Sequence, residues 1–145
     1  MSDASLNISD LLDDAELVAF VVYELSAARP SDGTGMTSAE EPASVSPEMR
    51  IGYDRNSENT GFRVRVVVEM QVLEGRVVAD GALEYLTSNN ACPDYADEVI
   101  GEFTRDVGFL AAFPYIRECI SEITRRVFGE PITLPVVKRS QLTFD

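Results

Sequence analysis

The strongest structural pattern in the chain lies in residues 62–87, which are FRVRVVVEMQVLEGRVVADGALEYLT. Apolar side chains occupy every second position from Phe62 to Val72, and mostly charged or amide side chains lie between them. A period of two is typical of a strand that buries one face. Glu74-Gly75 is short enough for a hairpin turn, and the alternation resumes from Arg76 to Thr87. These residues predict an antiparallel β-hairpin.

The return strand of this hairpin should divide its side chains between two faces. We expect an inward set of Val77, Ala79, Gly81, Leu83 and Tyr85 and an outward set of Val78, Asp80, Ala82 and Glu84. Two more strands precede the hairpin. Residues 17–25 are apolar on both faces, and residues 47–54 place Met49, Ile51 and Tyr53 on one face. Residues 26–47 between them are rich in Pro, Gly and Ser, which predicts a mobile loop.

Helices are expected after the strands, because from Asp94 the apolar period changes from two to about 3.6. The first helix would bury Tyr95, Val99, Phe103 and Val107, and the second would bury Ile116, Cys119, Ile120, Ile123 and Val127. Gly108 interrupts the pattern, Pro114 suits the first helical position, and Gly129 ends the second helix. We therefore predict an α+β fold, in which a four-stranded antiparallel sheet is followed by two helices packed on one face.

The length of 145 residues fits one domain. We expect a flexible acidic leader over residues 1–15, a single domain over 16–137 and a short polar tail over 138–145. Strand 17–25 and the apolar stripe of residues 95–107 present more apolar surface than one thin sheet can bury, which predicts an oligomer.

The composition argues against several classes of function. The net charge of −13 repels phosphate backbones and acidic lipids, so neither nucleic acid nor membrane is an expected partner. The chain has no histidine, which excludes Ser-His-Asp and Cys-His catalysis and histidine-dependent zinc sites. Cys92 and Cys119 are too few for a disulfide framework or a four-cysteine metal site. We expect no enzymatic activity, metal or cofactor, and, without signal-peptide features at Met1–Ser5, a cytoplasmic protein.

Residues 112–121, AFPYIRECIS, resemble the helix signature F-P-Y-x-R-E-C-I of the SecB protein-export chaperones. Residues 47–54, PEMRIGYD, are similar to that family's P-E-V-x-L-x-L-D strand, and Pro135-Val136-Val137 weakly resembles its ending. The predicted order of strands and helices matches as well. The resemblance implies an ATP-independent holdase that keeps precursor or other client chains unfolded before translocation and assembles as a homotetramer, a dimer of dimers.

The resemblance also implies two sites. The client-binding residues would be Met49, Ile51, Tyr53, Phe113, Ile116, Ile120 and Ile123, although their pattern alone fits an ordinary core. A flexible methionine beside an aromatic ring suits unrelated client segments. Contact with the export motor SecA would use Glu24, Val78 and Asp80, which could equally form a solvated sheet face.

Two departures from the family pattern bear on the SecA contact. The chain as given ends without the family's C-terminal helix, and the family's I-S-F-E-A-P segment is LSAARP at residues 25–30. Both weaken the expectation of SecA binding and favour a divergent SecB-like branch, of which some members serve toxin–antitoxin modules.

Three alternatives therefore stay open: a chaperone dedicated to one antitoxin, a hot-dog-like enzyme, and a small scaffold that binds one folded partner. Cys119 beside Arg117 could be an activated thiolate, but its place on the apolar stripe favours a buried structural role.

Overall fold

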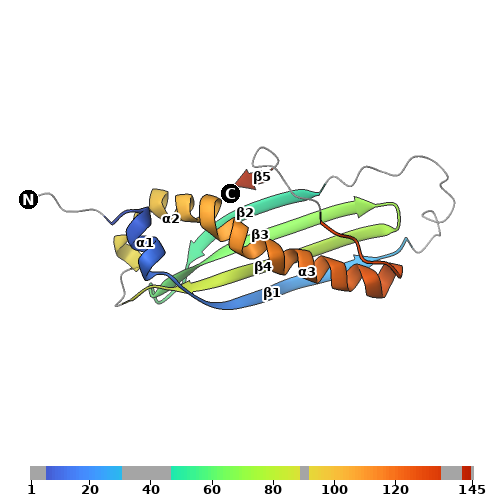
Figure 1. Ribbon diagram of the computed structural model, residues 1–145, viewed down its shortest axis with the longest axis horizontal. Helices are drawn as coiled ribbons and strands as arrows, with labels where there is room; N and C mark the ends of the chain where they lie inside the picture. Colours follow the sequence, from blue (N-terminus) through green and yellow to red (C-terminus); the bar gives the residue numbers. More distant parts are fainter. Residues whose placement is uncertain (1–5, 31–46, 89–91, 135–141, 145) are drawn as a thin grey trace, which may run out of the picture.

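A five-stranded sheet covered by one long helix forms the body of the protein (Figure 1). The computed structural model describes residues 6–30, 47–88, 92–134 and 142–144. The strands are β1 (Glu16–Ala28), β2 (Glu48–Arg55), β3 (Gly61–Val72), β4 (Gly75–Leu86) and β5 (Leu142–Phe144). Their order across the sheet is β1-β4-β3-β2-β5. The first four strands pair antiparallel, as predicted, and β5 lies parallel to β2.

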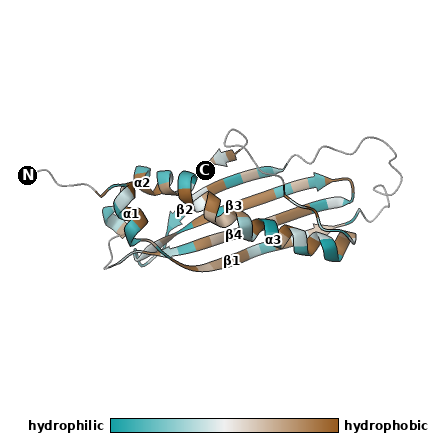
Figure 2. Ribbon diagram, viewed as in Figure 1, coloured by the Kyte–Doolittle hydropathy of each residue, from teal (hydrophilic) through white to brown (hydrophobic). Residues whose placement is uncertain are grey.

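The predicted hairpin is confirmed as β3 and β4. Val72 pairs with Gly75, so the two-residue loop is Leu73-Glu74, one residue earlier than the predicted Glu74-Gly75, and Gly75, with a φ of +150°, begins β4. The predicted inward residues are buried, and Figure 2 shows apolar residues, in brown, along the strands and along α3. Val78 and Ala82, which we expected to face outward, are also buried. Ala82 is small and lies between Val21 of β1 and Arg65 of β3, whose longer side chains cover it.

The expectation of a four-stranded, purely antiparallel sheet is wrong, because β5 adds a fifth strand. This strand falls in the segment that we predicted to be a short polar tail. A run of three residues is too short to show a period, and its pairing depends on the free edge of β2. The long loop expected over residues 26–47 begins later than predicted, since β1 continues to Ala28. Residues 31–46 lie outside the described residues.

The helical part is continuous where we expected a break. Helix α2 (Asp97–Phe103) passes through a π-helical turn (Thr104–Gly108) into α3 (Phe109–Phe128). Gly108 keeps helical backbone angles, and its role is close packing: an added Cβ would lie 2.7 Å from a methyl group of Val64. Pro114 lies inside α3 instead of at its first position. The end of the helix is as predicted, because Gly129 adopts the left-handed conformation that closes it.

The N-terminal segment is folded, so the expectation of a flexible leader is wrong for residues 6–15. Helix α1 (Ile8–Asp14) begins with a capping box between Asn7 and Asp10. Leu11 is fully buried, and α1 packs against α2. Asp14 accepts hydrogen bonds from Ser88 and from the hydroxyl of Tyr95 (2.9 Å). The helix is therefore part of the core.

The core lies between the sheet and the helices. Its densest part is an aromatic cluster in which Phe62 and Tyr85 stack on each other and Phe103 meets both rings edge-on, at 5.4 and 5.1 Å between centroids.

Within the described parts of the chain, no helix is long and apolar enough to cross a membrane.

Candidate functional site

The residues predicted to bind clients come together on the side of the sheet that α3 covers, but they differ in accessibility. Four of them are core residues of the folded chain: Met49, Ile51, Ile116 and Ile120, each no more than 1% exposed. Tyr53, Phe113 and Ile123 are half-buried. A client could touch only the second group while this conformation is kept. We use the name groove for the region of β2 and α3 that these seven predicted residues occupy.

The groove is covered by the end of the chain itself. Residues Pro131–Leu134 follow α3, and the backbone N–H of Ile132 donates a hydrogen bond to Oγ1 of Thr124 on that helix (2.8 Å). Leu134 is fully buried. Figure 1 shows this segment crossing the sheet before β5 reaches the edge of β2. We call Pro131–Leu134 together with β5 the C-terminal cover. Its strand β5 occupies the edge of β2 beside Met49 and Ile51.

Part of the groove wall remains open along α3. A shallow hollow there is lined by Phe113, Pro114, Arg117, Glu118, Ser121 and Thr133. Leu110, which lies one helical turn before this hollow, is 64% exposed, and it is the most exposed large apolar side chain described. The hollow therefore combines an aromatic ring and a proline with charged side chains on its rim.

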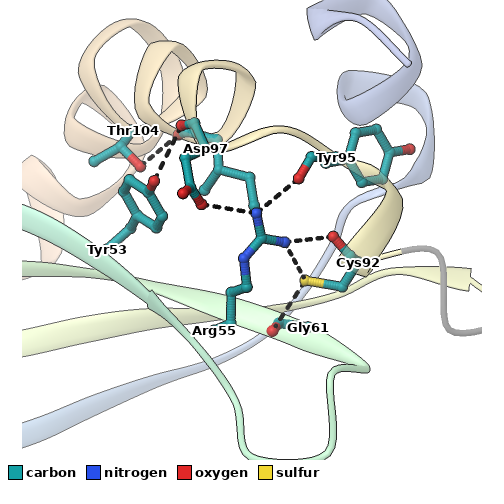
Figure 3. Close-up of polar contacts among 8 residues, drawn as sticks. Tyr53, Arg55, Gly61, Cys92, Tyr95, Asp97 and Thr104 are labelled. Atoms are coloured by element: carbon teal, nitrogen blue, oxygen red, sulfur yellow. Dashed lines mark hydrogen bonds and ion pairs between the residues drawn. The ribbon is translucent and has the colours of Figure 1, made fainter. Parts of the chain in front are cut away.

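A cluster of hydrogen bonds fixes the end of β2 to the start of α2 (Figure 3). The guanidinium of Arg55 donates to the carbonyl oxygens of Cys92 and Tyr95 (2.5 and 2.7 Å) and to the carboxylate of Asp97 (2.9 Å). The hydroxyl of Tyr53 donates to the backbone oxygen of Asp97 (3.0 Å). The hydrogen bond from Arg55 lowers the pKa of Asp97, and burial, followed by the charge of Asp97, raises the pKa of Tyr53.

This cluster gives Tyr53 a structural role beside the predicted client-binding one. No local pattern in the sequence indicates the partners of Arg55, which lie 37–42 residues away. Both terminal nitrogens of its guanidinium donate hydrogen bonds within the chain, so the cluster holds the helix.

The residues predicted to contact SecA lie together on the opposite face of the sheet. Glu24 is paired with Asp80 in the register of β1 and β4, and Val78 lies two residues from Asp80 on the same face. However, Asp80 accepts two hydrogen bonds from Arg65 (2.9 and 2.6 Å). Arg63 binds Asp54 in the same way, and the Tyr23 ring lies against both guanidiniums at 5.1 Å. This face is therefore of mixed charge.

The β1 edge is the most apolar exposed strand. Leu17, Val18, Val22 and Tyr23 are each more than 40% exposed. Phe20 stacks on Tyr115 of α3 at 4.8 Å, and that tyrosine is also exposed. The apolar stripe of residues 95–107 was the second reason for predicting an oligomer, and it is weaker than expected. Tyr95 and Phe103 of this stripe are buried within the chain, under α1 and over the sheet.

The described residues contain no group of three His, Cys, Asp or Glu side chains able to hold a metal ion. Cys119 is half-buried, and burial, together with the charges of Glu122 and Glu118, raises the pKa of its thiol. A raised pKa is the opposite of thiolate activation, so Cys119 fits the structural role that its place on the apolar stripe suggested.

Comparison with known proteins identifies the fold. No family model and no curated protein sequence matches the chain. Among solved structures, it is similar to a SecB-like chaperone of Mycobacterium tuberculosis in complex with a ChAD peptide from the HigA1 antitoxin. The identity is 18%, the TM-score is 0.71, and the match covers 90% of this chain and 92% of that one. At 18% sequence identity the similarity is evidence for the fold alone. The chain has the SecB-like fold.

A second solved structure, a protein of unknown function from Streptococcus agalactiae, is far less similar. It is 8% identical, covers 85% of this chain and 98% of its own, and has a TM-score of 0.39.

Proposed function

We propose that this protein is a SecB-like chaperone that binds unfolded segments of client polypeptides without using a nucleotide. A fold alone does not imply a function, so the proposal depends on the surface of this chain. The observation that carries it is the open hollow along α3, lined by Phe113, Pro114 and Thr133 among others, with the exposed Leu110 one helical turn before it. Apolar side chains held in an open groove suit client segments that expose apolar residues.

The charge of the protein supports the same class of client. Its net charge of −13 attracts unfolded chains that carry basic residues. Added salt should slow the association, since it screens exposed charges over about 10 Å at 0.1 M. The complex itself should survive salt, because burial of apolar surface carries the affinity.

The test is suppression of aggregation of an unfolded client by the purified protein. Phe113→Ser and Tyr53→Ser should each weaken suppression, and Glu118→Gln in the same hollow is the matched polar control. Because Tyr53 also holds α2, its variant must be shown to retain the wild-type circular dichroism spectrum. If Phe113→Ser suppresses aggregation as well as wild type does, the groove is not the client site.

A second candidate is a chaperone dedicated to an antitoxin. It is favoured by the similar structure, in which a SecB-like chaperone holds an antitoxin peptide, and by the arginine-rich outer face, where Asp80 is already paired with Arg65. Export through SecA would need an acidic docking face. Exposed ion pairs contribute only about 0–1 kcal/mol each, so several acidic residues would have to act together. Titration of SecA against wild type and Asp80→Lys separates the two: binding that Asp80→Lys abolishes supports export. Capture of a co-expressed antitoxin supports the second candidate.

We further propose that the protein acts in the cytoplasm as a homotetramer. The apolar β1 edge supplies the surface, since specific interfaces bury on the order of 1,600 Å². Light scattering that finds only monomers at tens of micromolar would contradict this assembly.

A further inference from the structure

The two segments of the C-terminal cover share a sequence pattern. Ile132-Thr133-Leu134 and Leu142-Thr143-Phe144 each consist of a threonine between two large apolar residues. Leu134 is fully buried, and Ile132 and Leu142 pack against the core cluster, whereas Phe144 is exposed. The threonines are exposed. Alternation of this kind is typical of an extended segment, and it is complete in residues 132–134 and holds for the first residue of β5.

Strand β5 is attached to the sheet by few contacts. It pairs with Met49, Arg50 and Ile51, three of the eight residues of β2, in a parallel register beside an otherwise antiparallel sheet. Phe144 remains 39% exposed and contacts the guanidinium of Arg105 at 5.9 Å. A three-residue strand with an exposed terminal side chain opens easily, because few hydrogen bonds and little apolar burial oppose its release.

The C-terminal cover occupies the place that a client would need. Its strand β5 pairs with Met49–Ile51 along the edge of β2, two of which the family resemblance assigned to the client groove, and the N–H of Ile132 donates a hydrogen bond to the hydroxyl of Thr124 on α3. An exposed strand edge accepts an extended segment through main-chain hydrogen bonds, and side-chain pockets then select its sequence.

We propose that the C-terminal cover is a built-in competitor of the client, which must be displaced before an extended client segment can fill the groove. The inference rests on the proposed function and specifies its regulation. It also specifies the client chemistry: extended segments with large apolar residues at alternate positions, like the two that the chain supplies. Where the covered state is favoured about tenfold, the apparent dissociation constant for a client rises by about the same factor.

A disulfide lock tests this competition in the full chain. Arg50 and Thr143 are register partners, both exposed on the outer face, and the ion pair of Arg50 with Glu69 is long (4.0 Å). Adjacent strands lie within the reach of a disulfide. The variant Arg50→Cys/Thr143→Cys, in a Cys119→Ser background, can therefore fix β5 to β2 without altering the core. Thr143→Cys alone in the same background is the control.

The probe is fluorescently labelled, reduced and carboxamidomethylated α-lactalbumin, a permanently unfolded chain, and the readout is anisotropy. Oxidation of the double variant should abolish binding except by the fraction left unoxidised, and a reductant should restore it, whereas the control should not respond. The open variant Leu142→Ser/Phe144→Ser should bind the probe about tenfold more tightly than wild type. Circular dichroism confirms that each variant keeps its fold.

The outcomes separate this inference from the proposed function. If the oxidised and reduced forms bind equally well, the cover does not compete, and the inference is overturned while client binding stands. Weaker binding by the open variant also overturns it, because β5 is then part of the client surface. Binding by the open variant but not by wild type supports it strongly. If no form binds the probe, the proposed function fails and the inference fails with it.

Discussion

The two edges of the sheet differ in whether a further strand of the described chain pairs with them. At the β2 edge, β5 pairs with the sheet and the residues beneath it are buried, with Ile51 fully inaccessible. At the β1 edge, the described chain provides no further strand, and Leu17, Val18, Val22 and Tyr23 remain exposed. Unpaired apolar edges invite pairing with another chain. The difference indicates that one edge is completed within the chain, and we propose that the other is completed by assembly.

The largest effect is expected from removing apolar volume beneath the β2 edge. Ile51→Ala should lower the free energy of unfolding by about 2–5 kcal/mol, because it leaves a cavity in a packed core. Leu17→Ala at the β1 edge should cost well under half as much in the monomer, since its side chain is 41% exposed. Denaturant unfolding of dilute protein measures both. Equal losses would mean that the β1 edge is as well covered in solution as the β2 edge.

The next effect should appear in assembly. Val22→Lys places a charge on the apolar β1 edge without disturbing the monomer, in which Val22 is exposed. Burying that charge between subunits should raise the dissociation constant of the oligomer by about 30-fold, or roughly 2 kcal/mol.

Light scattering across a dilution series measures this change. Gln71→Lys, an exposed position at the end of β3, introduces the same charge elsewhere and should leave assembly unchanged. An oligomer that is unaffected by Val22→Lys would place the interface away from this edge.

A smaller effect is expected at the C-terminal cover. Thr124 is buried, donates to the carbonyl of Ile120 (2.7 Å) and accepts from the N–H of Ile132. Thr124→Val removes this acceptor at nearly constant volume, so the segment should lose about 1 kcal/mol of local stability and the Ile132 amide should exchange several-fold faster.

Hydrogen exchange provides the measurement for the Thr124→Val prediction. Thr104→Val is the matched control, because Thr104 is also buried and donates to the carbonyl four residues earlier, yet it does not hold the cover. If both variants change the exchange of Ile132 equally, the Thr124 hydroxyl does not anchor the cover.

The smallest effect concerns Asp14 at the end of α1, just before β1, and it depends on pH. Burial alone would raise the pKa of Asp14, but hydrogen bonds from Ser88 and Tyr95 outweigh it and the pKa lies below its usual 3.8. A lowered pKa means that the carboxylate stabilises the fold above pH 3.8 and that this stability is lost as the pH falls through the folded-state value.

Asp14→Asn should therefore cost about 1 kcal/mol or less at pH 7, and the difference from wild type should shrink below about pH 4. Thermal unfolding at both pH values checks this. Asp13→Asn, an exposed neighbour, is the control. A difference that stays constant with pH would show that the carboxylate charge of Asp14 is not what holds α1.

Much of the fold could be predicted because its patterns are local. The period of two along β3 and β4 sets which side chains are buried, and the change to a helical period marks the covering helix. The apolar β1 edge was also visible as a strand without polar faces. The continuity of α2 and α3 was not, because a π-helical turn at Thr104–Gly108 absorbs the interruption that Gly108 suggested.

The candidate site was predicted less completely than the fold. Sequence placed Met49, Ile51, Ile116 and Ile120 in one cluster but could not tell a groove floor from a core, since both require apolar residues at the same spacing. Likewise it placed Glu24 and Asp80 on one face but could not show that Arg65 neutralises Asp80, because the two lie on neighbouring strands.

The sequence by itself determined the α+β class, the presence of the β3–β4 hairpin, the buried stripes and the acidic charge, since these follow from residue type and local spacing. Only the tertiary structure decided that α1 packs on the core, that Arg55 holds α2 and that the last described residues close the β2 edge. Each of these joins segments that are distant in the chain. Whether such a contact forms depends on the free edge, carbonyl or apolar surface that the rest of the fold leaves without a partner.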